Sequence, residues 1–355
     1  ALHHISIGDL WPVDEVAQRK LEIESAGLEW TVVESIPVHE SIKIGNSDAK
    51  RFTDIFIENL KTVAQFGIKT VCYNFMPVVD WTRTNLSMEM PTGVKALAFD
   101  IVEFAAFDLY VLNRTGARTN YERRVVELAE KRFGTWSDAD VDRVEKTIIA
   151  GLPGAELHHD RASFSSLLSA YEGLKPDQLR QHLRTFVKAV APVARDLGVN
   201  LAIHPDDPPF ELFGLPRVLS TPADILWVMN SCDLPENGIT FCTGSLGAGA
   251  EKDIVGWFRS VAHRVNFLHL RNVSCSEYGS FYEAEHLEGD VDMVRLIDAV
   301  LAQEKERGAP IPMRPDHGHL FERDAASSSN PGYSFLGRMR GLAELRGVER
   351  ALGSI

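Results

Sequence analysis

The feature of this chain that most restricts its fold is the alternation of short apolar runs with segments of helical periodicity. The apolar runs are rich in β-branched and aromatic residues, and each closes on polar side chains. Six of them are found, at residues 28–40, 68–77, 198–209, 237–245, 265–272 and 311–317. Several of the intervening segments end on a glycine, as at Gly27 and Gly67, which is typical of a helix C-terminus. Strands alternating with helices predict a parallel α/β sheet.

The number of strands distinguishes between two α/β architectures. A further run at Ala1–Ile5 would be a seventh strand, one fewer than the eight of a (β/α)₈ TIM barrel. We therefore predict a single TIM-barrel domain over residues 1–355, with its first strand preceding residue 1. The alternative is an open doubly wound sheet, which more often has a glycine-rich phosphate loop after its first strand. Neither GxGxxG nor GxxxxGK[ST] occurs here, so the barrel is favoured.

Residues 78–197 interrupt the alternation. They contain about four helical patterns, clearest at 95–114 and 179–198, and no convincing strand. A long insertion after a barrel strand lies at the C-terminal face, where barrel enzymes build their active sites. We expect residues 78–197 to cap the active site. The alternative is a helical arm used only for contacts between subunits.

Charge and cysteine content exclude several classes of protein. The formal net charge is -13, from 37 basic and 50 acidic side chains, whereas nucleic-acid binders usually carry a basic face. The four cysteines show no CxxC spacing, so neither a disulfide framework nor a zinc knuckle is predicted. A reducing, cytoplasmic location is expected. No apolar run reaches transmembrane length, so no membrane association is expected.

Four strand ends carry side chains that bind metals. His204, Cys242, His269 and Asp316 each end a predicted strand, two residues after another position expected to face inward. Because side chains alternate along a strand, all four should point toward the barrel axis at the same end. Each residue alone is more often structural, since a lone buried cysteine usually packs as a small hydrophobe. Two imidazoles, a thiolate and a carboxylate together favour a divalent metal site.

The same regions closely resemble the mannonate dehydratase family of the hexuronate-degrading pathway. The resemblance extends from residue 1 to near the C-terminus. It rests on TVVESIPVHESIK (31–43), TVCYNFMPVVDWTRT (70–84), IIAGLPGAE (148–156), IHPDDPP (203–209), FCTGSLG (241–247), EAEHLEGDVDM (283–293), PMRPDHGH (312–319) and NPGYSFLGRMRGLAELRGVE (330–349). It implies a xylose-isomerase-like TIM barrel, a homodimer, and elimination of water from D-mannonate to give 2-keto-3-deoxy-D-gluconate with Mn²⁺ or a similar divalent ion.

The resemblance also implies roles for particular residues. The metal ligands of the family fall on His204, Cys242, His269 and Asp316, and the residues of proton transfer fall on His317 and Tyr333. The thiolate favours Zn²⁺ or Fe²⁺ by softness, while the family points to Mn²⁺, so the metal stays open. His317 and Tyr333 are expected to share proton removal at C2 and protonation of the C3 hydroxyl, in an order that the residues do not decide.

Substrate binding requires further polar groups. Arg271 lies two residues beyond His269, on the same side of the predicted strand, and is expected to pair with the substrate carboxylate. Asn74, at the end of TVCYN, is expected to bond a hydroxyl. An Arg and a metal near Tyr333 are expected to lower the pKa of its phenol.

Other polar residues near these motifs have alternative interpretations. Asp206 and Asp207 either orient His204 or cap a loop. Glu34 is expected at the rim of the site, and Trp81 and Arg83 are expected to cover the pocket from the insertion.

Three other functions compete with the dehydratase. A metal-dependent sugar or sugar-acid isomerase or epimerase would have much the same layout. A zinc-dependent phosphodiesterase barrel acting on DNA would need two or three metals and a basic face, which the net charge opposes. A non-catalytic sugar-acid binding protein would not need His317 and Tyr333 beside a metal.

Overall fold

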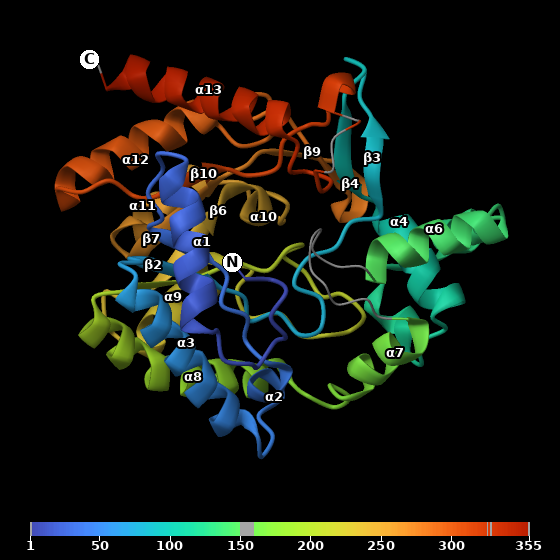
Figure 1. Cartoon of the computed structure of the whole chain (residues 1–355). Helices are drawn as coiled ribbons and strands as arrows, with labels where there is room; N and C mark the ends of the chain where they lie inside the picture. Colours follow the sequence, from blue (N-terminus) through green and yellow to red (C-terminus); the bar gives the residue numbers. More distant parts are fainter. Residues whose placement is uncertain (1, 150–159, 325, 327–328, 354–355) are drawn as a thin grey trace.

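The computed structural model of the chain describes residues 2–149, 160–324, 326 and 329–353 (Figure 1). Six strands form a parallel sheet in the order β1-β2-β5-β6-β7-β10. They are β1 (Val32–Glu34), β2 (Thr70–Tyr73), β5 (Asn200–Ile203), β6 (Asn237–Cys242), β7 (Val265–Leu270) and β10 (Met313–Pro315). This order follows the chain without reversal. It is the order of a barrel, and it excludes the doubly wound alternative, whose strand order reverses.

Each of the six predicted runs contains one of these strands, although every strand is shorter than its run. The prediction of a strand at Ala1–Ile5 is wrong for the residues described, because residues 2–5 form a turn, while Ala1 lies outside the described part. A strand before residue 1 stays a prediction.

The sheet curls so that its two outer strands approach each other. Arg314 on β10 forms an ion pair with Glu34 on β1, with Nη1 2.6 Å from Oε2. Inside the curl, Cys72, Ala202 and Phe267 from three strands form a small buried cluster. The alternate side chains of the strands point outward into the main core. The fold is therefore of the TIM-barrel type, as predicted.

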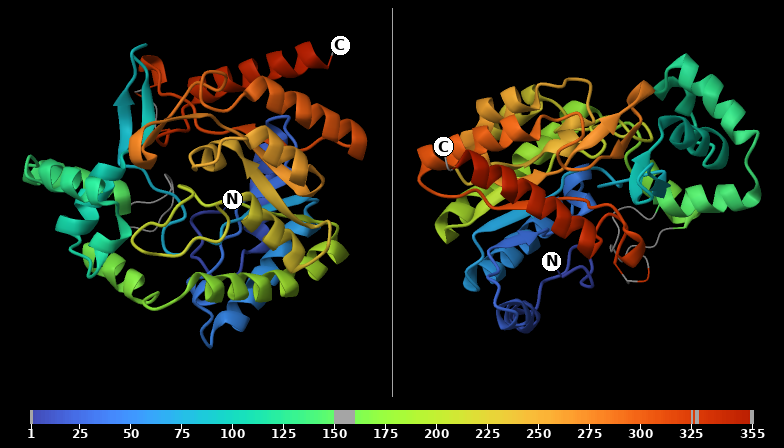
Figure 2. Two further views of the ribbon diagram at one scale, coloured as in Figure 1. Left: turned by 180° about the vertical axis from the view of Figure 1, so that it is seen from behind. Right: turned by 90° about the horizontal axis from the view of Figure 1, so that it is seen from above.

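Helices cover the outer face of the curled sheet (Figures 1 and 2). They are α1 (Val13–Ser25), α3 (Ala49–Gln65), α8 (Pro176–Leu197), α9 (Pro222–Ser231), α11 (Ile254–Val261), α12 (Met293–Arg307) and α13 (Phe335–Leu352). Their apolar faces supply the other half of the main core, as Phe186 of α8 does against Tyr73 of β2, with ring centroids 5.6 Å apart. The short helices α2 (Glu40–Ile44) and α10 (Thr243–Gly247) instead lie in the connections that follow the carboxyl ends of β1 and β6. Among the described residues, no helix combines the length and the apolar character needed to cross a membrane.

The segment between β2 and α8 contains two strands that we did not predict. It contains β3 (Asn85–Glu89), β4 (Lys95–Phe99), α4 (Ile101–Ala106), the π-helical η1 (Phe107–Val111), the 3₁₀ turn η2 (Ala117–Asn120), α5 (Arg123–Phe133), α6 (Asp138–Ile149) and α7 (Arg161–Ser169). We expected no strand here and a helix from residue 95, but residues 95–99 form β4. Pairing with β3 and with distant β9 (Phe281–Glu283) outweighs local helical propensity. Residues 150–156 of the family-like IIAGLPGAE lie outside the described part.

A second, antiparallel sheet joins this segment to the region after β7. Its order is β3-β4-β9-β8, where β8 is Val273–Cys275. The helical part of the segment lies to one side of the barrel (Figure 2), whereas α8 packs in the main core and belongs to the barrel wall. The remaining short turns are η3 (Ala262–Arg264), η4 (Glu277–Gly279) and η5 (Glu322–Asp324).

Candidate active site

A cavity of about 340 Å³ opens at the carboxyl ends of the parallel strands. Its lining combines side chains from the strand ends, the segment after β2 and the loop before α13. The lining residues are His3, Glu34, Ser35, Asn74, Asp80, Trp81, His204, Asp207, Arg314, Asp316, His317, Asn330 and Tyr333. Most of these side chains are polar or charged, which suits a polyhydroxylated anion rather than an apolar ligand.

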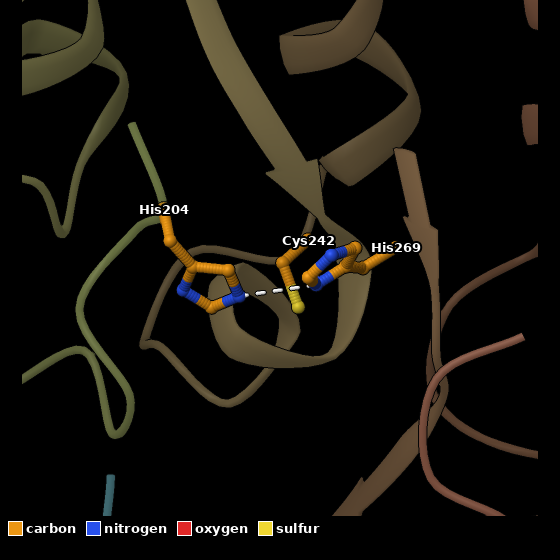
Figure 3. A group of neighbouring side chains, drawn as sticks. All are labelled: His204, Cys242 and His269. Atoms are coloured by element: carbon orange, nitrogen blue, oxygen red, sulfur yellow. Dashed lines mark hydrogen bonds between the residues drawn. The ribbon is translucent and has the colours of Figure 1, made fainter. Parts of the chain in front are cut away.

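His204, Cys242 and His269 converge at this end of the barrel (Figure 3). His204 follows β5, Cys242 ends β6 and His269 lies near the end of β7, where the sheet pairs it with Cys242. One potential ligand atom from each residue lies within 4.8 Å of the other two. Adjacent parallel strands thus bring together three of the four residues predicted to bind a metal.

Hydrogen-bonding groups around the two histidines orient their rings. Nδ1 of His204 donates to the carbonyl oxygen of Pro205, 2.7 Å away, which leaves the lone pair on Nε2. Nε2 of His269 lies 3.2 Å from Oε2 of Glu34, and the negative charge there favours a hydrogen on Nε2 and the lone pair on Nδ1. Such partners on the far nitrogen are typical of histidines that bind metals.

The separation of the two ligand nitrogens fits one bound ion. Nε2 of His204 lies 3.2 Å from Nδ1 of His269. Two nitrogens that each lie ~2.0–2.1 Å from a tetrahedral ion are roughly 3.3 Å apart. Two imidazole nitrogens and a thiolate form a donor set suited to Zn²⁺ or Fe²⁺, and imidazole also accepts Mn²⁺. These residues therefore fit a divalent metal.

Asp316, the fourth predicted ligand, lies beside this group. Its Oδ2 is 3.8 Å from Nδ1 of His269, and its Oδ1 accepts a hydrogen bond of 2.7 Å from Arg314. Burial disfavours the charge of Asp316, but Arg314, His317 and His269 hold its pKa well below the ordinary value. The carboxylate is therefore available to a cation in this cavity.

His317 shares the cavity with Asp316 because of an unusual backbone conformation. Its φ is +35°, in the left-handed region that non-glycine residues rarely adopt. Neighbours on a regular strand point to opposite faces, whereas here both side chains line one cavity. Nδ1 of His317 lies 3.1 Å from Oε1 of Glu283, and its ring meets those of Trp81 and Tyr333 edge to face, at 5.9 and 5.4 Å.

Tyr333 reaches the same cavity from the predicted turn. Its amide donates to the carbonyl of Asn330, and the amide of Gly318 donates to the carbonyl of Gly332, which places the phenol beside His317. Burial and the charge of Asp316 raise the pKa of Tyr333, and Arg314 only partly opposes that shift. The protein groups alone therefore act against the lowered pKa that we expected.

Arg271 does not lie where we expected it. Its side chain is 1% exposed and is absent from the cavity lining. It pairs with Asp207 at 2.6 Å and with Glu283 at 2.7 Å. Because the Arg271 guanidinium is buried and does not line the cavity, a direct bond to the substrate carboxylate is not supported. The cavity-lining arginine is Arg314, two residues before Asp316, a position that we had noted only as facing inward.

Arg83 is also buried rather than placed over the pocket. It pairs with Asp207 at 3.0 Å and with Glu283 at 2.8 Å, and it packs against Trp81, which does line the cavity. Asp207 thus joins two arginines instead of orienting His204. Asp206 instead caps a loop: it accepts hydrogen bonds from the backbone of Val218 and Leu219 and from the hydroxyl of Ser220.

Asn74 lines the cavity as predicted, together with a group that we missed. Its Nδ2 lies 3.4 Å from Oδ2 of Asp80. Asp80 is in turn 3.4 Å from Nζ of the buried Lys43, which also bonds Glu40. Asp80 belongs to the family-like stretch 70–84, and this resemblance could have identified it as a residue of the site. Glu283 was missed too, although it opens the family-like stretch 283–293, because no local pattern connects it with Arg271 or His317.

Comparisons with known proteins agree with this geometry. The family described as D-mannonate dehydratase (UxuA) matches residues 1–355. The chain is 48% identical to Mannonate dehydratase 2 of Agrobacterium fabrum, over 99% of this chain and 90% of that protein. It is 46% identical to a mannonate dehydratase of Saccharophagus degradans, with the same two coverages.

A solved structure is similar over the same span. The mannonate dehydratase of Streptococcus suis serotype 2 superposes with a TM-score of 0.78 at 30% identity, covering 99% of this chain and 86% of that one. Matches of this length and identity establish a common family. The chain belongs to the D-mannonate dehydratase family.

Proposed function

We propose that this protein is a hydro-lyase that removes water from D-mannonate to give 2-dehydro-3-deoxy-D-gluconate. Full-length membership of the D-mannonate dehydratase family supports the reaction class. The observation that carries the proposal is that His204, Asp316, His317 and Tyr333 line one polar cavity, while Cys242 and His269 lie beside His204. An elimination next to a carboxylate needs a metal, a base and an acid at one place.

His204, Cys242 and His269, with Asp316, would hold the divalent ion. That ion, Mn²⁺ by family resemblance and Fe²⁺ as the alternative, supplies a Lewis acid for the charge that develops on the substrate carboxylate. Glu34 and the carbonyl of Pro205 orient the two imidazoles for that task.

The cavity offers charged and polar groups for the rest of the substrate. Arg314 is the arginine on the wall, and it takes the role that we first expected of Arg271, pairing with the substrate carboxylate. Asp80 would accept hydrogen bonds from the hydroxyl groups, and the amide of Asn74 would donate to them. The buried ammonium of Lys43 keeps Asp80 in place.

His317 and Tyr333 would carry the proton transfers. One takes the proton from C2, the C3–oxygen bond breaks, and the other gives a proton to the departing hydroxyl, which leaves as water. The enol so formed becomes the 2-keto acid by tautomerisation. Their rings lie 5.4 Å apart on one side of the cavity, so both can reach adjacent carbons of one bound molecule.

The segment at residues 78–197 would cap this site with its first part, since Trp81 lines the cavity and Arg83 supports it from behind. We further propose a homodimer in the cytoplasm, where the four free cysteines would stay reduced. Light scattering on the purified protein tests the dimer.

One assay tests the main proposal. Purified protein is incubated with D-mannonate after EDTA treatment, with and without added Mn²⁺, and the product is measured as a 2-keto-3-deoxy acid by its semicarbazone absorbance. Mn²⁺-dependent formation of the keto-deoxy acid is expected. A product of unchanged formula would identify an isomerase or epimerase instead, and bound metal without turnover would identify a binding protein.

A further inference from the structure

Glu283 is a buried carboxylate behind the cavity that the proposed reaction does not yet use. It lies on β9, in the antiparallel sheet rather than in the barrel, and its side chain is 3% exposed. Three cationic or donor groups surround it: Nη2 of Arg83 at 2.8 Å, Nε of Arg271 at 2.7 Å and Nδ1 of His317 at 3.1 Å. They come from three distant parts of the chain.

The charges in this group balance without His317. Asp207 pairs with the same two arginines, at 3.0 Å to Arg83 and 2.6 Å to Arg271. Two guanidinium groups therefore face two carboxylates. A buried charge is tolerated when it is paired and hydrogen-bonded in this way. Glu283 is consequently held in one position as an anion, with Oε1 turned toward His317.

An anion at this place determines which nitrogen of His317 carries the proton. The buried Nδ1 has no hydrogen bond of good geometry among the residues that the structure describes, but the anionic Oε1 of Glu283 lies beside it, 3.1 Å away. Nδ1 therefore keeps its hydrogen toward Glu283, and the lone pair lies on Nε2. Nε2 is the nitrogen on the side of the candidate metal ligands, 4.0 Å from Oδ2 of Asp316. Trp81 and Tyr333 pack edge to face against the ring.

We propose that Glu283 is a positioning residue for His317: it fixes the ring and its tautomer so that Nε2 faces the bound substrate. Arg83 and Arg271 in turn hold Glu283 in place. Holding Glu283 is thus the role of Arg271, which we first expected to bind the substrate carboxylate. Because Arg83 precedes β3, the capping segment also contributes to placing a proton-transfer group. The inference rests on the proposed dehydratase function.

The first test is Glu283→Gln, assayed with D-mannonate and Mn²⁺. The amide keeps the size of the side chain but no longer specifies a hydrogen on Nδ1. A decrease in kcat of ~10²-fold or more is expected, with KM within a few-fold and full metal content. Glu285→Gln is the matched control, because Glu285 lies two residues on, bonds His319 and Arg340, and is expected to leave kcat unchanged.

A double variant separates positioning from a merely structural role. In a His317→Asn background, Glu283→Gln is expected to cause no further decrease in kcat, since the group that it positions is already lost. A further decrease equal to that of the single variant would overturn the inference. So would a Glu283→Gln protein with normal kcat while the wild type is active. A wild type that does not dehydrate D-mannonate would instead refute the proposed function.

A second single variant keeps the inference testable if Glu283→Gln does not fold. Glu283→Asp keeps the charge for the two arginines but shortens the reach toward His317. It is expected to melt within a few degrees of the wild type and to lose kcat with KM little changed. Wild-type kcat in a folded Glu283→Asp protein would show that the distance to His317 is immaterial and would overturn the inference.

Discussion

The carboxylate of Glu34 lies 3.2 Å from Nε2 of His269, on the far side of the ring from His204. Burial disfavours the charge of Glu34, but Arg314 and His269 lower its pKa to about 2. The carboxylate is therefore ionised at neutral pH and keeps the proton of His269 on Nε2. Nδ1 is left free for a metal. Glu34 on β1 thus orients His269 on β7 so that its Nδ1 can bind a metal.

Removing the charge of Glu34 is expected to weaken metal binding. Glu34→Gln no longer holds His269 in one tautomer, and carboxylates of this kind typically contribute about 10–100-fold to metal affinity. Isothermal titration of the EDTA-treated protein with Mn²⁺ measures the change. Glu29→Gln, at an exposed position shortly before β1, is the control. Equal affinities in the Glu34 variant and the wild type would contradict this role.

Cys242→Ser is expected to lower metal content and activity together. A serine hydroxyl stays protonated near neutral pH and is a much poorer ligand than a thiolate. Metal content after dialysis and kcat are both measured. Cys232→Ser is the matched control, because Cys232 lies at the end of α9 and does not belong to the group of potential ligands formed by His204, Cys242 and His269. If the Cys242 variant keeps its metal and its turnover, this cysteine only fills space.

His317→Asn and Tyr333→Phe are each expected to lose ~10²-fold or more in kcat while keeping the metal. Both substitutions preserve most of the side-chain volume and remove the group that exchanges a proton. Turnover and metal content are determined for each variant. Near-normal kcat in one variant would remove that residue from proton transfer, and loss of metal together with activity would assign it a supporting role at the ion.

Stability is expected to fall at acid pH because of the buried pairs behind the cavity. Burial opposes the charges of Asp207 and Glu283, but Arg271 and its neighbours Arg83 and His317 hold both pKa values well below their ordinary ones. The unfolded chain therefore binds more protons than the folded protein once the pH falls below about 4.5. Stability is full above that pH and decreases below it, by up to about 1.4 kcal/mol per pH unit for each carboxylate.

Urea unfolding of the EDTA-treated protein, at about pH 5.5 and about pH 3.5, measures this loss. Removal of metal beforehand separates it from protonation of the ligands. Glu283→Gln lacks one of the two carboxylates, so its unfolding free energy should change less between the two pH values. An equal change in both proteins would show that Glu283 does not contribute to the pH dependence.

The sequence by itself determined the barrel and the group of His204, Cys242 and His269. Both depend on local patterns. Side chains along a strand alternate between its two faces, and each of these strands ends at or beside a polar residue. Parallel strands that follow one another in chain order then place their carboxyl ends at one edge. No long-range information is needed for three side chains on adjacent strands to meet.

Only the tertiary structure decided which arginine faces the cavity. The alternation of side chains along a strand predicts that Arg271 and Arg314 both face inward, because each lies two residues from a predicted metal ligand. The difference is made by Asp207 and Glu283, which pair with Arg271 and bury it. Glu283 reaches that place because β9 pairs with β4, and its bond to Arg83 spans 200 residues. Residues 95–99 became a strand through the same pairing. Contacts between such distant segments leave no periodic trace in the sequence, because each partner obeys only its own local pattern.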